Sequence, residues 1–142
     1  MEPDYPIFCE DCEPPIGEAD FAELERRFGF EFPAAFKAHY LQFNGGYLPE
    51  AQMERQRIAF GGFEPIRYGK LPAERLYTDL LESFPQLLGL LPFAYDQGGS
   101  CFLIGLHPGR YRHRIYIFLM DGEELVPVED SFERFMMLLG EA

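Results

Sequence analysis

The sequence is poor in cysteine, in basic residues and in long apolar runs, and each shortage excludes a class of protein. Three cysteines in 142 residues do not make a disulfide scaffold, and an odd, sparse count suits a reducing compartment. No apolar stretch is long enough to span a bilayer. The start, "MEPDYPIFCE", lacks the basic residues and the apolar run of a signal peptide. We therefore expect a soluble, cytoplasmic protein.

Basic residues are half as numerous as acidic ones, with 12 Lys and Arg against 24 Asp and Glu, so the net charge is −12. The imbalance is uneven: residues 1–25 carry −9, residues 26–120 carry +3 and residues 121–142 carry −6. Such a surface repels phosphates, which argues against binding to nucleic acid or to an anionic membrane and favours a basic protein partner. For any single acid, the better interpretation is simply that it keeps the protein soluble.

Apolar and aromatic residues are plentiful, with 47% hydrophobic residues, 15 Phe and 8 Tyr. A chain of this length fits one domain, which can bury roughly 68–70% of its unfolded surface without disulfide or metal support. Residues 1–16 are acidic and aperiodic, which predicts an extended lead-in before a single domain over residues 17–142.

Hydrophobic periodicity predicts a first half rich in helices and a second half rich in strands. Apolar spacing and flanking Pro or Gly indicate helices at 18–29, 33–43, 73–84 and 131–140. Asp20 is a candidate cap for the first helix, and Asp130 or Ser131 for the last. Strands are expected at 57–63, 90–96, 100–106, 114–120 and 125–128, with a bulge at Gly61-Gly62 and an edge strand at 125–128. The fold class is therefore α+β: a mainly antiparallel sheet with helices packed against it.

Two glycine pairs stand out. In "QFNGG", Asn44 and Gly45 suit the left-handed position that often follows a helix, but Gly46 is left unexplained. In "DQGGS", Gly98 and Gly99 suit a hairpin turn that needs positive φ. We hypothesise that the two turns lie together and frame a cleft, with Gly46 keeping side chains out of it.

Reactive groups are present, but none forms a complete site. Cys9 and Cys12 have the spacing of half a zinc site, yet Cys101 and the three histidines supply no second paired motif. Ser100 lacks a G-x-S-x-G elbow and an evident base. An enzyme that uses Asp96 as its base is the least favoured alternative. We expect no catalytic residue, metal or cofactor.

Four segments resemble the SMI1/KNR4 (SUKH) superfamily. They are the helix–Pro–helix–Asn-Gly-Gly run "IGEADFAELERRFGFEFPAAFKAHYLQFNGG" (16–46), the segment "LLPFAYDQGGSCFLIGL" (90–106), the strand "RIYIFLMD", and the closing helix "VEDSFERFMMLL". Their order and spacing cover most of residues 16–139. The chain departs from the family pattern at Ser100, where many members place an acid after the glycine pair, so a role for a carboxylate there is in doubt.

The resemblance implies a single non-catalytic α+β domain that acts by binding. Bacterial members are mostly immunity proteins that neutralise toxins from neighbouring cells, and fungal members act in cell-wall regulation. We expect an immunity protein whose acids steer a basic toxin, such as a nuclease, onto a blocking surface. The alternative is a regulatory or scaffold module that binds an endogenous protein. The candidate contact residues are Glu10, Asp11, Glu13, Glu50, Glu54, Asp96, Glu123 and Glu124.

Overall fold

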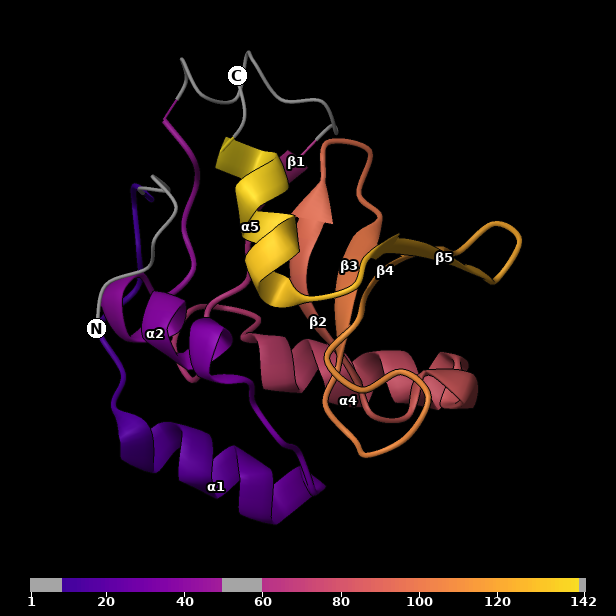
Figure 1. Ribbon diagram of the computed structural model, residues 1–142, viewed down its shortest axis with the longest axis horizontal. Coiled ribbons are helices and arrows are strands. Elements are labelled where there is room, and N and C mark those ends of the chain that lie inside the picture. Colours follow the sequence, from indigo (N-terminus) through magenta and orange to yellow (C-terminus); the bar gives the residue numbers. More distant parts are fainter. Residues whose placement is uncertain (1–8, 50–59, 141–142) are drawn as a thin grey trace.

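The computed structural model describes residues 9–49 and 60–140. Three helices lie in the first part of the chain, four of the five strands follow them, and a last helix closes the chain, as the periodicity predicts (Figure 1). Among the described residues, no helix combines the length and the apolar character needed to cross a bilayer. In chain order the elements are α1 (Glu18–Phe28), α2 (Ala34–Gln42), β1 (Phe60–Phe63), α4 (Ala73–Ser83), the 3-10 turn η1 (Pro85–Leu87), β2 (Leu90–Asp96), β3 (Cys101–Gly105), β4 (Ile115–Leu119), β5 (Glu124–Glu129) and α5 (Phe132–Gly140).

The strands form one antiparallel sheet in the order β1-β2-β3-β4-β5, so every strand pairs with its neighbour in sequence. This confirms the predicted α+β class. β5 lies at an edge, as expected, where Pro127 is tolerated. The register of β1 against β2 shifts between Phe60 and Gly62, which confirms the predicted bulge.

Both faces of the central strand β3 are buried because helices cover the sheet on two sides. Phe102 and Ile104 belong to the larger apolar cluster, which includes residues of α1, α2 and α5. Cys101 and Leu103 alternate with them and face a second cluster, packed by residues of α4 and η1. Figure 1 shows α5 lying across one face of the sheet while α4 runs below it.

Aromatic side chains hold the larger cluster together. Phe36 of α2 stacks on Tyr40 at 4.5 Å between ring centroids and meets the edge of Phe132 at 5.1 Å. Phe132 and Phe135 of α5 are fully buried, as the helical spacing predicts, and each stabilises the fold by about 2–3 kcal/mol through burial. Ser131 Oγ accepts a hydrogen bond from the Arg134 N–H, so Ser131 is the cap of α5.

Two details of the helix ends differ from prediction. α1 begins after Gly17, and Asp20 accepts the Gly17 N–H from inside the first turn instead of preceding the helix. α2 ends with Phe43 in an extended conformation, and positive φ appears at Gly45 and Gly46 but not at Asn44. The predicted left-handed conformation is therefore found at Gly45 and not at Asn44, whose side chain forms hydrogen bonds in the interior.

Candidate functional site

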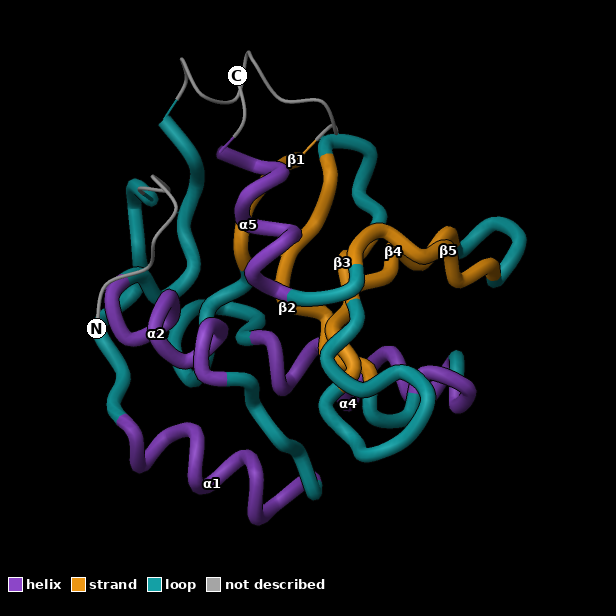
Figure 2. The backbone as a smooth tube through the Cα atoms, viewed as in Figure 1, coloured by secondary structure: helices purple, strands orange, loops and turns teal. Residues whose placement is uncertain are grey.

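A cavity of about 200 Å³ lies where four separate stretches of chain meet. One wall is the N-terminal segment, residues 9–16, which is hydrogen-bonded to the chain that follows α2 (Figure 2). The opposite wall is the 64–71 loop, which follows β1. The lining residues are Asp11 and Glu13, Gly46 and Tyr47, Phe63 to Pro65, Gly69 to Leu71, and Tyr95 of β2.

Asn44 connects the two walls behind this cavity. Its side chain is 2% exposed. Nδ2 donates to the carbonyl oxygens of Pro14 at 3.0 Å and Ile66 at 2.9 Å, and Oδ1 accepts from the Ile66 N–H at 2.7 Å. One amide thus bonds both the N-terminal segment and the 64–71 loop, and it satisfies the buried N–H and carbonyl groups of Ile66, which would otherwise lack partners.

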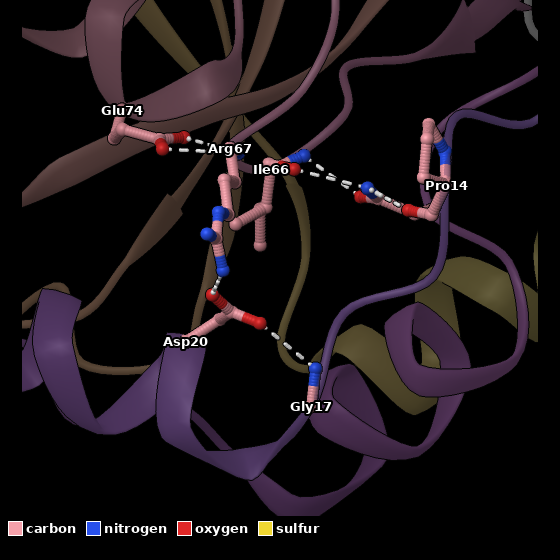
Figure 3. Close-up of polar contacts among 7 residues, drawn as sticks. Pro14, Gly17, Asp20, Ile66, Arg67 and Glu74 are labelled. Carbon is pink, nitrogen blue, oxygen red and sulfur yellow. Dashed lines mark hydrogen bonds and ion pairs between the residues drawn. The ribbon is translucent and has the colours of Figure 1, made fainter.

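Arg67 holds the 64–71 loop against two helices, as Figure 3 shows. Its Nη1 donates to Asp20 Oδ1 of α1 at 2.8 Å, and its backbone N–H donates to the carboxylate of Glu74 in α4. Asp20 Oδ2 accepts the Gly17 N–H in turn, and this bond, together with Arg67, lowers the pKa of Asp20. Arg67 thus links the 64–71 loop to both α1 and α4.

Gly45 and Gly46 bring the chain after α2 up to both walls. Their φ angles are +83° and +92°, which side chains other than glycine rarely adopt. A Cβ at Gly45 would lie 3.0 Å from Pro65 Cβ, and one at Gly46 would lie 2.5 Å from the Glu10 carbonyl oxygen. The second glycine is needed because the N-terminal segment passes directly over it, with the Glu10 and Tyr47 backbones exchanging hydrogen bonds.

Two tyrosines form an aromatic side of the cavity above the bulge in β1. A Cβ at Gly62 would lie 2.6 Å from Tyr95 Oη and 3.0 Å from Tyr47 Cδ1, so both rings cover this glycine. Tyr95 is hydrogen-bonded to Tyr47, and its pKa is raised first by burial and then by that bond. Tyr47 remains 47% exposed. Tyrosine is enriched among the residues that contribute most of the binding energy at protein interfaces.

The electrostatics of the cavity are dominated by carboxylates. Glu64 is half-buried, and burial raises its pKa to about 7. Asp11 and Glu13 are exposed on the opposite wall, and Lys70 is the one basic residue among the lining residues. The cavity therefore attracts cations, and a cation placed in it would favour the ionised form of Glu64.

The predicted contact acids fall into separate places. Glu10, Asp11 and Glu13 share the N-terminal segment at the cavity. Glu123 and Glu124 lie at the β4–β5 turn, which projects on the opposite side of the molecule in Figure 1. Glu50 and Glu54 lie outside the described residues.

Asp96 shapes its own turn. Its Oδ1 accepts the N–H groups of Gly98 at 3.0 Å and Ser100 at 2.7 Å, which is the local turn chemistry expected of an Asp before glycines. Residues 97–100 do not line the cavity, so this turn is not a wall of it. Of the two glycine-bearing regions, the first contributes Gly46 to the cavity lining and the second contributes Tyr95, the residue before Asp96.

Sequence reasoning missed Tyr47, Glu64 and Tyr95. Tyr47 follows the Gly45-Gly46 pair directly, and that adjacency was the available signal. Glu64 and Tyr95 belong to paired stretches of backbone, since the Glu64 N–H donates to the Phe93 carbonyl oxygen. Their convergence depends on the bulged register of β1 on β2, which local sequence does not encode.

The thiols and histidines do not form a reactive centre in the described part of the chain. Cys9 Sγ lies 3.9 Å from His39 Nε2, but burial raises the pKa of Cys9 to about 12 and lowers that of His39 to about 3. A neutral thiol beside a neutral imidazole is a poor nucleophile. Within residues 9–49 and 60–140, no three His, Cys, Asp or Glu side chains are grouped so as to hold a metal ion.

Comparison with known proteins identifies the family. No curated protein and no solved structure matches the chain. The model of the SMI1 / KNR4 family (SUKH-1) matches residues 15–137, a range that contains all five strands and every cavity-lining residue except Asp11 and Glu13. Because this match covers most of the chain and the α+β fold agrees with the expected one, the protein belongs to the SMI1/KNR4 family (SUKH-1).

Proposed function

We propose that this protein is an immunity protein that binds a basic toxin and blocks its active site. The family includes immunity proteins and is generally non-catalytic. The observation that carries the proposal is the cavity, whose carboxylates and exposed Tyr47 sit on walls held in place by Asn44 and Arg67. A rigid, acidic surface binds a basic protein without losing much conformational entropy.

The acidic surface favours, as the partner, a toxin that acts on nucleic acid. Enzymes that bind phosphate backbones carry basic clefts, and a protein of net charge −12 complements such a cleft. The acids compete with the phosphates for the same Lys and Arg side chains, so occupation of the cleft excludes the substrate without any chemical step.

Co-purification with the product of the adjacent gene tests this proposal. We expect a stoichiometric complex on size exclusion, inhibition of the partner's nuclease activity in vitro and rescue of growth when both proteins are co-expressed. A complex that forms without inhibiting any toxic activity would favour the alternative, a regulatory module for an endogenous protein. No complex and no rescue would reject the immunity role.

A further inference from the structure

The cavity has the chemistry of a receptor for one extended organic cation. Its carboxylates stand on two walls, with Asp11 and Glu13 on the N-terminal segment and Glu64 on the 64–71 loop. No three acidic, His or Cys groups in the described ranges are close enough to share a metal ion. The carboxylates share a volume of about 200 Å³ with partly exposed Tyr47 and Leu71, which suits an organic cation.

The apolar side chains that line the cavity distinguish between the kinds of organic cation that could bind. Tyr47 and Leu71 are 47% and 40% exposed, although both are large hydrophobic residues, and both line the cavity. A guanidinium group is planar and weakly hydrated, stacks on aromatic rings and donates to several carboxylates at once. A lysine ammonium is compact and strongly hydrated, so it gains less from an aromatic wall.

From this arrangement we propose that the cavity is the docking pocket for a single arginine side chain presented by the protein partner. The guanidinium lies against Tyr47 and between Glu64 and the acids of the N-terminal segment, while its methylene stem contacts Leu71. This inference rests on the proposed function for the identity of the partner, but the pocket itself can be tested without that partner.

Titration of Glu64 should give binding in the pocket a characteristic pH dependence. A bound guanidinium stabilises the carboxylate form, so affinity rises as pH rises through the pKa of Glu64, which is about 7. Lys70 also lines the pocket, where its ammonium group competes with a bound guanidinium for the carboxylates. The titratable and charged groups that line the cavity with Glu64 are Asp11, Glu13, Tyr47, Lys70 and Tyr95. Tyr40, Tyr95 and Cys101 are the groups whose pKa values the charge of Glu64 raises.

The probes are the peptides acetyl-Gly-Arg-Gly-amide and acetyl-Gly-Lys-Gly-amide, titrated into the ¹⁵N-labelled full chain and followed by NMR. We expect amide shifts at Gly46, Tyr47 and the 64–71 loop, and binding of the arginine peptide about fivefold tighter than that of the lysine peptide. Affinity should increase about threefold or more between about pH 6 and pH 8. Equal binding of the two peptides, or shifts spread over all acidic surfaces, would overturn the proposal.

Matched variants complete the test. Tyr47→Leu and Glu64→Gln should each weaken the arginine peptide about fivefold or more, and Glu64→Gln should also abolish the pH dependence. Glu123→Gln with Glu124→Gln changes the net charge at the distant β4–β5 turn and should leave binding within about twofold. Weakening by this distant pair to the same extent would reduce the effect to overall charge and reject the pocket.

The outcomes also separate this inference from the proposed function. If the arginine peptide binds as described while the adjacent gene product does not bind, the arginine pocket is supported and the immunity role is rejected. If that product binds equally well to wild type and to Tyr47→Leu, the immunity role is supported and the arginine pocket is rejected.

Discussion

At the scale of single residues, Asn44 has the largest influence on the cavity. It is a buried polar side chain whose three hydrogen bonds are all to backbone groups of other segments. Its function follows from its shape: an amide offers an acceptor and two donors from one planar group. Neither a hydrophobic residue nor a carboxylate can satisfy the same three partners.

Replacing Asn44 tests this interpretation. Asn44→Ala should lower the free energy of unfolding by about 2–3 kcal/mol, because it leaves the Ile66 N–H and two carbonyl oxygens without partners. Denaturant unfolding monitored by tyrosine fluorescence measures the loss. Asn44→Asp has the same shape but turns a carboxylate oxygen toward the Pro14 and Ile66 carbonyls, so it should be at least as destabilising. An Asp variant as stable as wild type would show that only the shape matters.

Two buried titratable residues make stability depend on pH with opposite signs. The folded-state pKa of Glu64 is about 7 against a reference of 4.5, so its penalty appears as pH rises from about 4.5 through 7. The folded-state pKa of His39 is about 3 against 6.5, so its penalty grows as pH falls below about 6.5. Between these limits the two contributions oppose each other.

Single variants should separate the two contributions. Glu64→Gln should be more stable than wild type above about pH 7, by about 1–2 kcal/mol after allowance for solvent screening of a half-buried group, and equal to it near about pH 4. His39→Leu, of similar volume, should remove about 2 kcal/mol of destabilisation at about pH 5 relative to pH 7. Chemical denaturation over about pH 4.5–8 provides the readout, and parallel pH profiles for all three proteins would contradict both assignments.

At the scale of elements, the site is built mainly from connections, to which β1 and β2 add Phe63 and Tyr95. The N-terminal segment, the chain after α2 and the 64–71 loop meet through the Glu10–Tyr47 bridge, Asn44 and Arg67. Helices α1 and α4 contribute Asp20 and Glu74 as fixed anchors (Figure 3). Loops held at several points by regular elements are common carriers of binding residues.

The glycine turns provide a matched pair for testing this assembly. Gly46 and Gly99 have nearly the same φ, +92° and +91°, but a Cβ at Gly46 would meet the Glu10 carbonyl oxygen whereas one at Gly99 would meet nothing. Gly99→Ala should cost about 1–2 kcal/mol from the backbone conformation alone. Gly46→Ala should cost more and loosen the N-terminal segment.

Thiol labelling can report that loosening. Cys9 is 4% exposed, so in a Cys12→Ser background its reaction with a thiol reagent requires the N-terminal segment to move. We expect Gly46→Ala, but not Gly99→Ala, to accelerate labelling of Cys9 by about tenfold or more. Equal rates in the two variants would place the tight contact elsewhere.

At the scale of the whole molecule, the excess of acids governs encounter with a partner. The net charge of −12 produces a long-range field, whereas the cavity acts only at contact. Screening therefore affects the two stages differently, because salt weakens the field between separated molecules more than it weakens a desolvated ion pair.

Association kinetics should reveal this division. The association rate with the proposed toxin should fall by about tenfold or more between about 50 mM and 500 mM salt, and the dissociation rate should change by less than about threefold. Surface plasmon resonance over that range measures both rates. A salt-independent association rate would contradict electrostatic steering.

Elements with a strong local pattern were predictable from sequence. α1, α4, α5 and the strands β2 to β5 were anticipated because their apolar residues recur with a period of about four or of two, and the pattern is imposed by burial on one or both faces. The bulge in β1 was anticipated from Gly61-Gly62, and the end of α1 from Gly29.

The candidate site was much less predictable. The acidic segment around Asp11 and Glu13 was recognised from charge, and the Gly45-Gly46 turn from its two glycines. The convergence of Tyr47, Glu64 and Tyr95 was not, since it depends on a shifted strand register and on hydrogen bonds between residues 22 or more positions apart.

The sequence by itself determined the acidic charge, the Phe-rich core, the order of helices and strands and the family, because these depend on composition and short-range periodicity. Tertiary structure alone decided that Asn44 serves the interior and not a helix cap, that Asp96 closes its own turn, and that Glu64 lies half-buried opposite Asp11 and Glu13. The physical reason is that hydrogen-bond partners and burial belong to the packed molecule, in which segments distant along the chain compete for the same polar groups.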